Sequence, residues 1–334
     1  ALLSALLADP SALSSALYGA LEDNPNVTVV QGPDLVTDLK AVKNETELQG
    51  IRAAHVRDGV ALVEGYAKLE KMLQAGGDVT ECTVCDVLRE ERARQAGNRG
   101  PSFGTIAAYR GNAAMMHYAP KPGTCSKLEK SGLLLVDSGG QYLDGTTDIT
   151  RTYALGPVSR REKECYTRVL KSHIALATAV FLEGCTGGNV DILCREPLWK
   201  HGIDYRCGTG HGVGMFGGVH EGPQNLRTNN NVVLRAGMTL TNEPGVYETG
   251  AFGIRTENLM VVADAFENEY GRFLKFETMT LFPIDTAPVL PELLDDGELK
   301  WLNDYNLHVL ETLSPLVSAG GKDWLARHTR PLSR

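Results

Sequence analysis

The feature that most constrains this chain is a short apolar run that ends in an aspartate and a glycine turn. Residues 133–136 (LLLV) are apolar, Asp137 follows them, and Ser-Gly-Gly comes next. A run of this length before a turn predicts a buried β-strand with Asp137 at its end. A return strand is predicted over residues 142–153, which are rich in β-forming residues and include Asp148. Two adjacent strands would therefore bring both carboxylates to one place.

Two carboxylates placed together in a protein interior need a compensating charge. A buried carboxylate is costly unless it is paired, protonated or bound to a metal, and two close together repel each other. A cation would resolve both problems. The ordinary alternative is that Asp137 caps its own turn and Asp148 is a solvated loop residue. This segment alone favours the ordinary interpretation, and the choice depends on the rest of the chain.

Composition restricts the class of partner. The chain has 334 residues, of which 43% are hydrophobic, enough for one large domain or two of ordinary size. Its formal net charge is -8 and it has no run of Lys or Arg, so we expect no nucleic-acid surface. It shows no apolar run of membrane-spanning length and no basic leader, so we expect no membrane segment. A small or peptidic partner is expected.

The cysteines indicate a reducing compartment. There are seven, an odd number without regular spacing, which is not typical of a secreted disulfide framework. Cys82 and Cys85 form a C-x-x-C, but they fall in a helical pattern and no second pair completes a zinc site. We therefore expect both to be packing residues and the protein to be cytoplasmic.

A domain boundary is predicted near Lys43. Residues 1–25 are rich in Ala, Leu and Ser and predict a helix leading to a strand over residues 27–30. The segment lacks an initiator Met, and we expect further sequence upstream. Asn44 with Glu47 three residues later forms a capping box, which begins a long amphipathic helix that two glycines end after residue 75.

The remaining elements follow from periodicity, caps and turns. Helices are predicted over residues 80–95, 159–183 and 190–200, and two more in the tail after a proline-containing link over residues 285–291. Strands are predicted over residues 101–109, 113–118, 238–242, 253–255 and 274–281. The strand over residues 113–118 carries His117 near its end.

Residues 207–223 (CGTGHGVGMFGGVHEGP) form a glycine-rich stretch. It contains seven glycines and two histidines, His211 and His220. Glycine at this density indicates close backbone approach and suggests a site. Neither a P-loop nor a dinucleotide-binding pattern fits, because the motif residues and the strand–helix context are missing.

Acidic and imidazole side chains gather at strand ends and in the glycine-rich stretch. They are Asp137, Asp148, His211, Glu243 and Glu257. Four carboxylates carry the charge that two divalent cations neutralise, and five such ligands are what two metal ions need. Oxygen-rich coordination with one imidazole suits Mn²⁺ better than a thiolate-rich zinc site would, while Zn²⁺, Co²⁺ and Fe²⁺ remain open.

At these five positions the chain resembles the metallopeptidase family with the pita-bread fold, and within it the Xaa-Pro aminopeptidases (aminopeptidase P) of the cytosolic type. The motifs are LLLVDSG, TDITRT, GTGHGVG, TNEPGVY and GIRTEN, and the tail carries WLNDYN and WLARHTRPL. The resemblance implies an α+β fold with a curved, mostly antiparallel sheet covered by helices, in pseudo-twofold halves. It also implies that residues 1–44 end a preceding creatinase-like domain, 45–285 form the catalytic domain and 286–334 a C-terminal helical extension.

The resemblance also implies roles for single residues. Asp148 and Glu257 would bridge the two metals, Asp137 would bind one of them, and His211 and Glu243 the other. A water or hydroxide bridging the metals would hydrolyse the N-terminal Xaa-Pro bond. The remaining roles are proton transfer by Glu243, contact with the substrate or its oxyanion by His117 and His220, and support of the aspartates by Arg255.

Peptides with proline at the second position are the implied substrates, and a homodimer is the implied assembly. Tyr118 and Tyr247 would either contact substrate or pack. The alternatives are a prolidase, which cleaves Xaa-Pro dipeptides, a methionine aminopeptidase with the same ligands, a non-catalytic binding module of the same fold, and the metal-free creatinase. The presence of all five ligands disfavours the last two.

Overall fold

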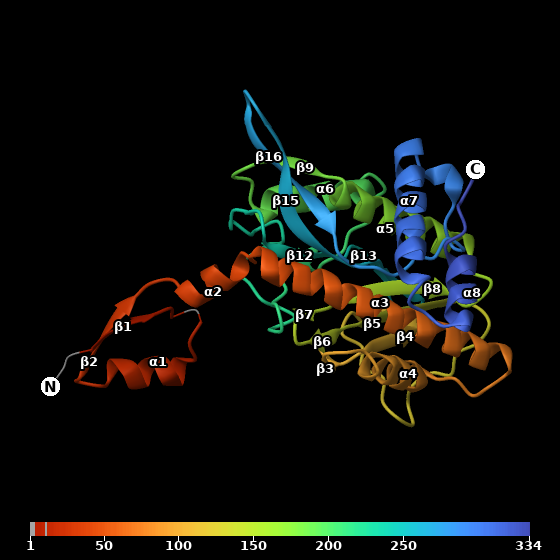
Figure 1. Ribbon diagram of the computed structural model, residues 1–334, viewed down its shortest axis with the longest axis horizontal. Coiled ribbons are helices and arrows are strands. Elements are labelled where there is room, and N and C mark those ends of the chain that lie inside the picture. The colour runs from red at the N-terminus through yellow and green to blue at the C-terminus, as the bar shows by residue number, and fades with distance from the viewer. Residues whose placement is uncertain (1–3, 11) are drawn as a thin grey trace.

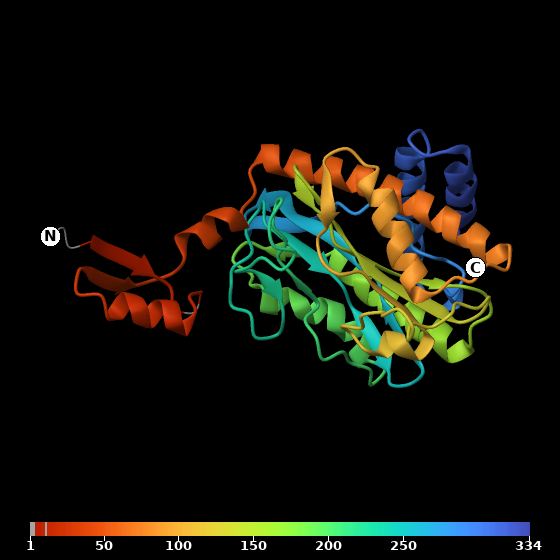
Figure 2. The same cartoon turned by 90° about the horizontal axis from the view of Figure 1, so that it is seen from below.

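A computed structural model describes residues 4–10 and 12–334 of the chain. In both views a small N-terminal unit lies apart from a large body, and helix α2 (Leu35–Ala41) joins the two (Figures 1 and 2). The unit pairs strand β1 (Ser4–Ala8) in parallel with β2 (Val27–Gln31), and α1 (Ser15–Glu22) connects them.

The helix predicted over residues 1–25 is wrong in its first part. Residues 4–8 are a strand, and the helix begins only at Ser15, where the side chain of Ser14 accepts a hydrogen bond from Leu17 N at 3.3 Å. A short apolar run fits either state by periodicity, and here pairing with β2 decides. The part of the prediction on residues 1–3 and 11 lies outside the described residues.

Helix α3 (Glu45–Gln74) runs along the body, as the capping box predicts (Figure 1). The Asn44 side chain accepts a hydrogen bond from Glu47 N at 3.0 Å, and the Glu47 carboxylate accepts one from Asn44 N at 2.8 Å. Helix α4 (Glu81–Ala93) begins with a second capping box at Thr80 and packs on α3. Both predicted helices are confirmed.

The strands of the body pair antiparallel. The first sheets have the orders β4-β5-β8 and β3-β6-β7. Their strands are β3 (Asn98–Pro101), β4 (Ile106–Tyr109), β5 (Leu133–Ser138), β6 (Gly140–Tyr142), β7 (Gly145–Thr146) and β8 (Ile149–Ala154).

The second half of the body contains the order β12-β15-β16-β9 and the pairs β13-β14 and β10-β11. Its strands are β9 (Val180–Leu182), β10 (Gly210–His211), β11 (Asn225–Leu226), β12 (Thr239–Asn242), β13 (Gly245–Glu248), β14 (Phe252–Arg255), β15 (Asn258–Asn268) and β16 (Gly271–Thr278). The hairpin β15–β16 projects from the body (Figure 1).

The strand predicted over residues 133–136 is confirmed, but the return strand predicted over residues 142–153 differs from the structure. Asp137 lies near the end of β5 and pairs with Thr150 of β8. Tyr142, however, belongs to β6, which folds back on β7 as a separate small hairpin. The hairpin starts at Gly139, where a Cβ would lie 2.0 Å from Thr147 O, so the chain turns away from β5 at a position that only glycine fits.

Other strands and helices also differ from the prediction. The single strand predicted over residues 101–109 is interrupted at residues 102–105, so that β3 and β4 belong to different sheets. Residues 113–118 form no strand, because the chain enters a 3-10 helix at Arg110–Ala114 with a positive φ of 49° at Arg110. The helix predicted over residues 159–183 ends at Ala177 (α5, Arg160–Ala177), and β9 then pairs with β16. Strand β15 has no counterpart among the predicted strands; pairing with β12 on one side and β16 on the other forms it.

Helices cover both sides of the sheets. Helices α3 and α4 lie on one side, with α5 and α6 (Gly187–Trp199) on the other (Figure 2). After a 3-10 turn (Pro291–Leu293), α7 (Asp296–Leu313) and α8 (Ala319–His328) pack on the body, where Trp324 stacks on Phe282 at 5.6 Å. Among the described residues, no helix is long and apolar enough to span a membrane.

Candidate metal centre

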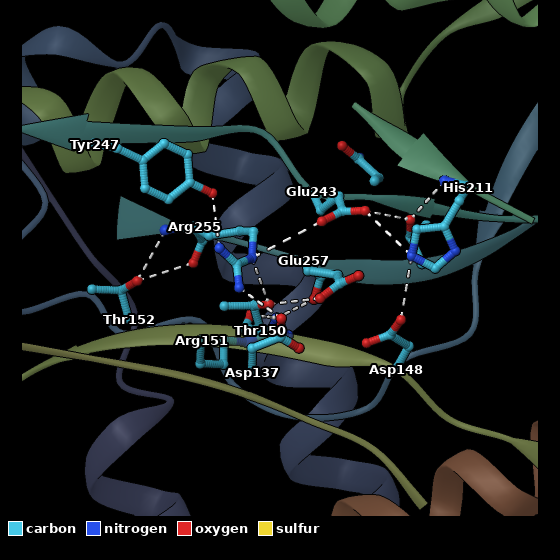
Figure 3. A network of polar contacts seen from close by, with 12 residues as sticks. Asp137, Asp148, Thr150, Arg151, Thr152, His211, Glu243, Tyr247, Arg255 and Glu257 are labelled. Atoms are coloured by element: carbon cyan, nitrogen blue, oxygen red, sulfur yellow. Dashed lines mark hydrogen bonds and ion pairs between the residues drawn. The ribbon is translucent and has the colours of Figure 1, made fainter. Parts of the chain in front are cut away.

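The structure brings the five predicted ligands together from five separate places in the sheets (Figure 3). Asp137 lies on β5 and Asp148 just before β8, His211 lies on β10, and Glu243 and Glu257 follow β12 and β14. Backbone hydrogen bonds fix the last two, from Glu243 N to Thr209 O at 2.8 Å and from Glu257 N to Thr150 O at 3.0 Å.

Three of the five form the tightest group. One ligand atom each of Asp148, His211 and Glu257 lies within 4.8 Å of the others. His211 Nε2 is 3.5 Å from Asp148 Oδ2 and 3.4 Å from Glu243 Oε1. His211 Nδ1 lies 3.0 Å from Gly212 O, which assigns the ring proton to Nδ1. The Nε2 lone pair is therefore directed at the carboxylates, as in a metal-binding imidazole.

Arg255 holds Asp137, the contact that the resemblance implies. Arg255 Nη2 donates to Asp137 Oδ2 at 2.6 Å, and Nη1 donates to Tyr247 Oη at 2.8 Å. Arg255 Nε is also 4.0 Å from Glu243 Oε2. The other Asp137 oxygen, Oδ1, is buried and has no hydrogen-bond partner within the described residues. One oxygen of Asp137 is thus occupied, and the other is left for a further positive partner.

Two threonines complete the cluster. Thr150 Oγ1 donates to Glu257 Oε2 at 2.6 Å and accepts from Arg255 Nε at 3.0 Å. Thr241 Oγ1 donates to Glu243 Oε1 at 3.1 Å. Sequence reasoning did not find either threonine, although each lies two residues along the chain from a predicted site residue.

Crowding changes the proton affinity of these groups. Burial raises the pKa of Asp148 and Glu257 well above their ordinary values, and the neighbouring carboxylates raise both further. Burial also raises the pKa of Glu243 to about 7. Burial lowers the pKa of His211, which favours the neutral, metal-binding imidazole.

These residues fit divalent cations. Four carboxylates surround the centre, and Arg255 is the one cationic side chain that forms an ion pair with any of them in the described part of the chain. The buried Asp137 Oδ1 lacks a donor, and His211 Nε2 lies beside two carboxylate oxygens rather than a proton donor. An oxygen-rich set with one imidazole matches the ligand preference of Mn²⁺ and similar ions.

A cavity of about 330 Å³ opens over the cluster. His117 and His220, both predicted site residues, lie in its wall, and the His220 ring stands edge-on to His211 with centroids 4.1 Å apart. Burial and the neighbouring His211 lower the pKa of His220. The wall also contains side chains that sequence reasoning missed, since apolar residues carry no chemical signal: Phe103, Ile106, Met116, Cys207 and Val219.

Comparison with known proteins places the chain in a family. Residues 49–264 match metallopeptidase family M24, and residues 272–332 match the C-terminal region of peptidase M24. The chain belongs to metallopeptidase family M24. The resemblance seen in the sequence is therefore confirmed at the level of the family and of its C-terminal region.

Relatives within family M24 extend the comparison. The chain is 47% identical to Aminopeptidase P2 of Arabidopsis thaliana over 327 residues, which is 96% of this chain and 45% of that protein. It is 45% identical to a probable Xaa-Pro aminopeptidase P of Laccaria bicolor, covering 92% of this chain and 49% of that protein. This M24 chain thus spans about half the length of the curated relatives it matches.

A solved structure supports the same placement. X-prolyl aminopeptidase from Caenorhabditis elegans, described as a cytosolic enzyme with a di-nuclear active site, superposes with a TM-score of 0.86 and 38% identity. The match covers 92% of this chain and 51% of that one. The α+β pita-bread fold that the sequence predicts is confirmed for this M24 chain.

Proposed function

We propose that this chain carries the catalytic centre of a metal-dependent Xaa-Pro aminopeptidase, which removes the N-terminal residue of a peptide when proline follows. The observation that carries the proposal is the convergence of the five predicted ligands beneath one cavity whose wall holds His117 and His220. The names of the relatives support the same activity.

We assign two divalent cations to the centre, with Mn²⁺ as the preferred ion. Asp148 and Glu257, the two most buried members of the five, would bridge the two cations, Asp137 would hold one, and His211 and Glu243 the other. When bound, the cations lower the pKa of a water and polarise the scissile carbonyl. Arg255 keeps Asp137 oriented through its 2.6 Å hydrogen bond.

The chain's own residues would handle the protons. The leaving proline nitrogen carries no N–H in the peptide and must gain a proton when the bond breaks. Glu243, which lies beneath the cavity, would take a proton from the water and pass it to that nitrogen. His117 and His220, which face the cavity, would donate hydrogen bonds to the substrate or to the developing oxyanion.

The proposal also covers the domains around this centre, the assembly of the protein and its compartment. We assign residues 1–44 to a preceding creatinase-like domain, 45–285 to the catalytic domain and 286–334 to a helical extension. A homodimer in the cytoplasm is proposed for the whole protein. Support comes from the apolar side chains exposed on α2, such as Leu39 at 77% exposure, from the seven free cysteines, and from the C. elegans relative described as cytosolic.

Peptide cleavage by the full-length protein with Mn²⁺ tests the activity. Ala-Pro-Ala should lose its N-terminal alanine, while Ala-Ala-Ala should be cleaved far more slowly. Cleavage of the Ala-Pro dipeptide alone would instead establish a prolidase. Equal rates on both tripeptides would contradict proline specificity, and a protein that binds no metal and cleaves nothing would be a non-catalytic module.

A further inference from the structure

The cavity residue His117 lies on a loop, residues 110–126, that does not fix its side chain directly. The His117 ring is exposed and makes no hydrogen bond within the described residues, although it lies in the wall of the cavity. Its position therefore depends on the loop backbone. Close to His117 the backbone is held by short turns, in which Met115 N donates to Asn112 O at 3.1 Å and Tyr118 N donates to Met115 O at 3.0 Å.

A single buried carboxylate holds this loop at both ends and in its middle. Glu81, in the first turn of α4, has 0% exposure. Its Oε1 accepts hydrogen bonds from Tyr109 N at 2.7 Å and Asn112 Nδ2 at 2.9 Å. Its Oε2 accepts from Tyr118 Oη and Ser126 N, each at 2.7 Å. Four donors, all from residues 109–126, thus converge on one carboxylate.

The contacts close into a network beside His117. Asn112 Nδ2 also lies 3.2 Å from Tyr118 Oη and 3.0 Å from Ser126 Oγ. Burial and the Glu81 carboxylate raise the pKa of Tyr118, so its hydroxyl remains a proton donor. Tyr118 is the next residue after His117, and hydrogen bonds to an ionised acceptor are among the strongest in proteins. The anchor of the loop is therefore one residue from the histidine that faces the cavity.

We propose that Glu81 is a positioning residue for His117: it fixes the loop of residues 110–126 so that the His117 ring faces substrate. The inference rests on the proposed function, because it gives His117 a substrate to contact. Glu81 does not line the cavity itself. Its effect reaches the reaction through Tyr118 and the backbone.

Glu81→Gln is the variant that tests this role. Each carboxylate oxygen accepts two hydrogen bonds, so a glutamine NH₂ would face two donors wherever it pointed. On the Oε2 side the Tyr118 hydroxyl can turn to accept, but Ser126 N–H cannot. The loop should then shift, and a misplacement of about 1 Å can cost about 100-fold in rate. We expect kcat/KM on Ala-Pro-Ala to fall about 10–100-fold in the full-length Mn²⁺ enzyme.

A matched control separates positioning from stability. Asp285 is also a buried carboxylate and accepts hydrogen bonds from Ala154 N at 2.9 Å and Ala287 N at 3.0 Å, but it does not line the cavity. Asp285→Asn should lower the melting temperature and leave kcat/KM unchanged. Tyr118→Phe, which removes one of the four hydrogen bonds to Glu81, should lower kcat/KM less than Glu81→Gln does.

A double-mutant cycle tests whether Glu81 acts through His117. With His117→Ala as background, adding Glu81→Gln should lower kcat/KM by no more than about twofold. If the loss of kcat/KM in the double mutant equals the product of the losses in the two single mutants, the proposal is overturned. A Glu81→Gln enzyme with wild-type kcat/KM would also overturn it. If the wild-type protein cleaves no peptide, the proposed function fails. NMR of the His117 ring then tests separately whether Glu81 positions this side chain. Glu81→Gln should shift that signal and Asp285→Asn should not; an unshifted signal in Glu81→Gln refutes the positioning role.

Discussion

Without bound cations, the buried carboxylates of the metal centre should make the folded protein less stable as the pH rises. Burial raises the pKa of Glu243 from 4.5 to about 7, so between these values the folded chain keeps a proton that the unfolded chain has lost. The folded state then binds more protons than the unfolded state, and the free energy of unfolding falls with pH. The pKa values of Asp148 and Glu257 are also raised, so these two groups change the stability in the same direction.

The size of the effect follows from Glu243 alone. A pKa raised from 4.5 to about 7 corresponds to about 3 kcal/mol of stability that is present below pH 4.5 and lost by about pH 7. Imidazoles act in the opposite direction, because burial lowers the pKa of His55, His173, His211, His220 and His328, and stability therefore rises as the unfolded imidazole loses its proton. Glu243→Gln keeps all of these imidazoles, so the difference in slope between this variant and the wild-type protein isolates the contribution of Glu243.

Urea unfolding of the chelator-treated protein at pH 5, 6, 7 and 8, with and without added Mn²⁺, measures this slope. Relative to Glu243→Gln, the metal-free wild-type protein should lose about 2–3 kcal/mol between pH 5 and pH 8. Added Mn²⁺ should stabilise it most at pH 8, since metal binds the deprotonated carboxylates. A metal-free wild-type protein with the same pH dependence as Glu243→Gln would refute the reasoning.

Two further substitutions test the assignments at the cluster. Asp148→Asn should lose both cations and all activity, whereas Asp137→Asn should retain about one cation per chain by elemental analysis; equal metal contents would contradict the bridging role of Asp148. Arg255→Lys should lower activity about 10–100-fold with little change in melting temperature, because a single ammonium cannot hold Asp137 and Tyr247 together as the guanidinium does. An Arg255→Lys enzyme of normal activity would show that this contact does not orient the ligand.

Much of the metal centre could be predicted from local sequence. The ligands follow short apolar or β-rich segments, so Asp137 and Glu243 could be placed at strand ends before any contact was known. Capping residues act within one helical turn, and Asn44 therefore located the start of α3 correctly. Signals of this kind depend only on neighbours in the chain, which is why they were reliable.

Other features depend on contacts between distant segments and could not be predicted. The strand state of residues 4–8 and of 258–268 comes from pairing partners elsewhere in the chain. Residues 113–118 have the pattern of a strand but form a loop, and the hydrogen bond from Tyr118 Oη to Glu81 joins residues that are 37 positions apart.

Asp137 and Asp148 show both kinds of feature, those set by local sequence and those set by distant contacts. The sequence by itself determined that Asp137 lies near the end of one strand and Asp148 just before another, and it predicted both as members of a five-residue ligand set. Only the tertiary structure decided that Arg255 occupies one oxygen of Asp137 and leaves the other without a donor, while Asp148 lies against His211. The physical reason is that strand formation is largely local, whereas the charge around a buried carboxylate is set by side chains more than 60 residues away in the sequence.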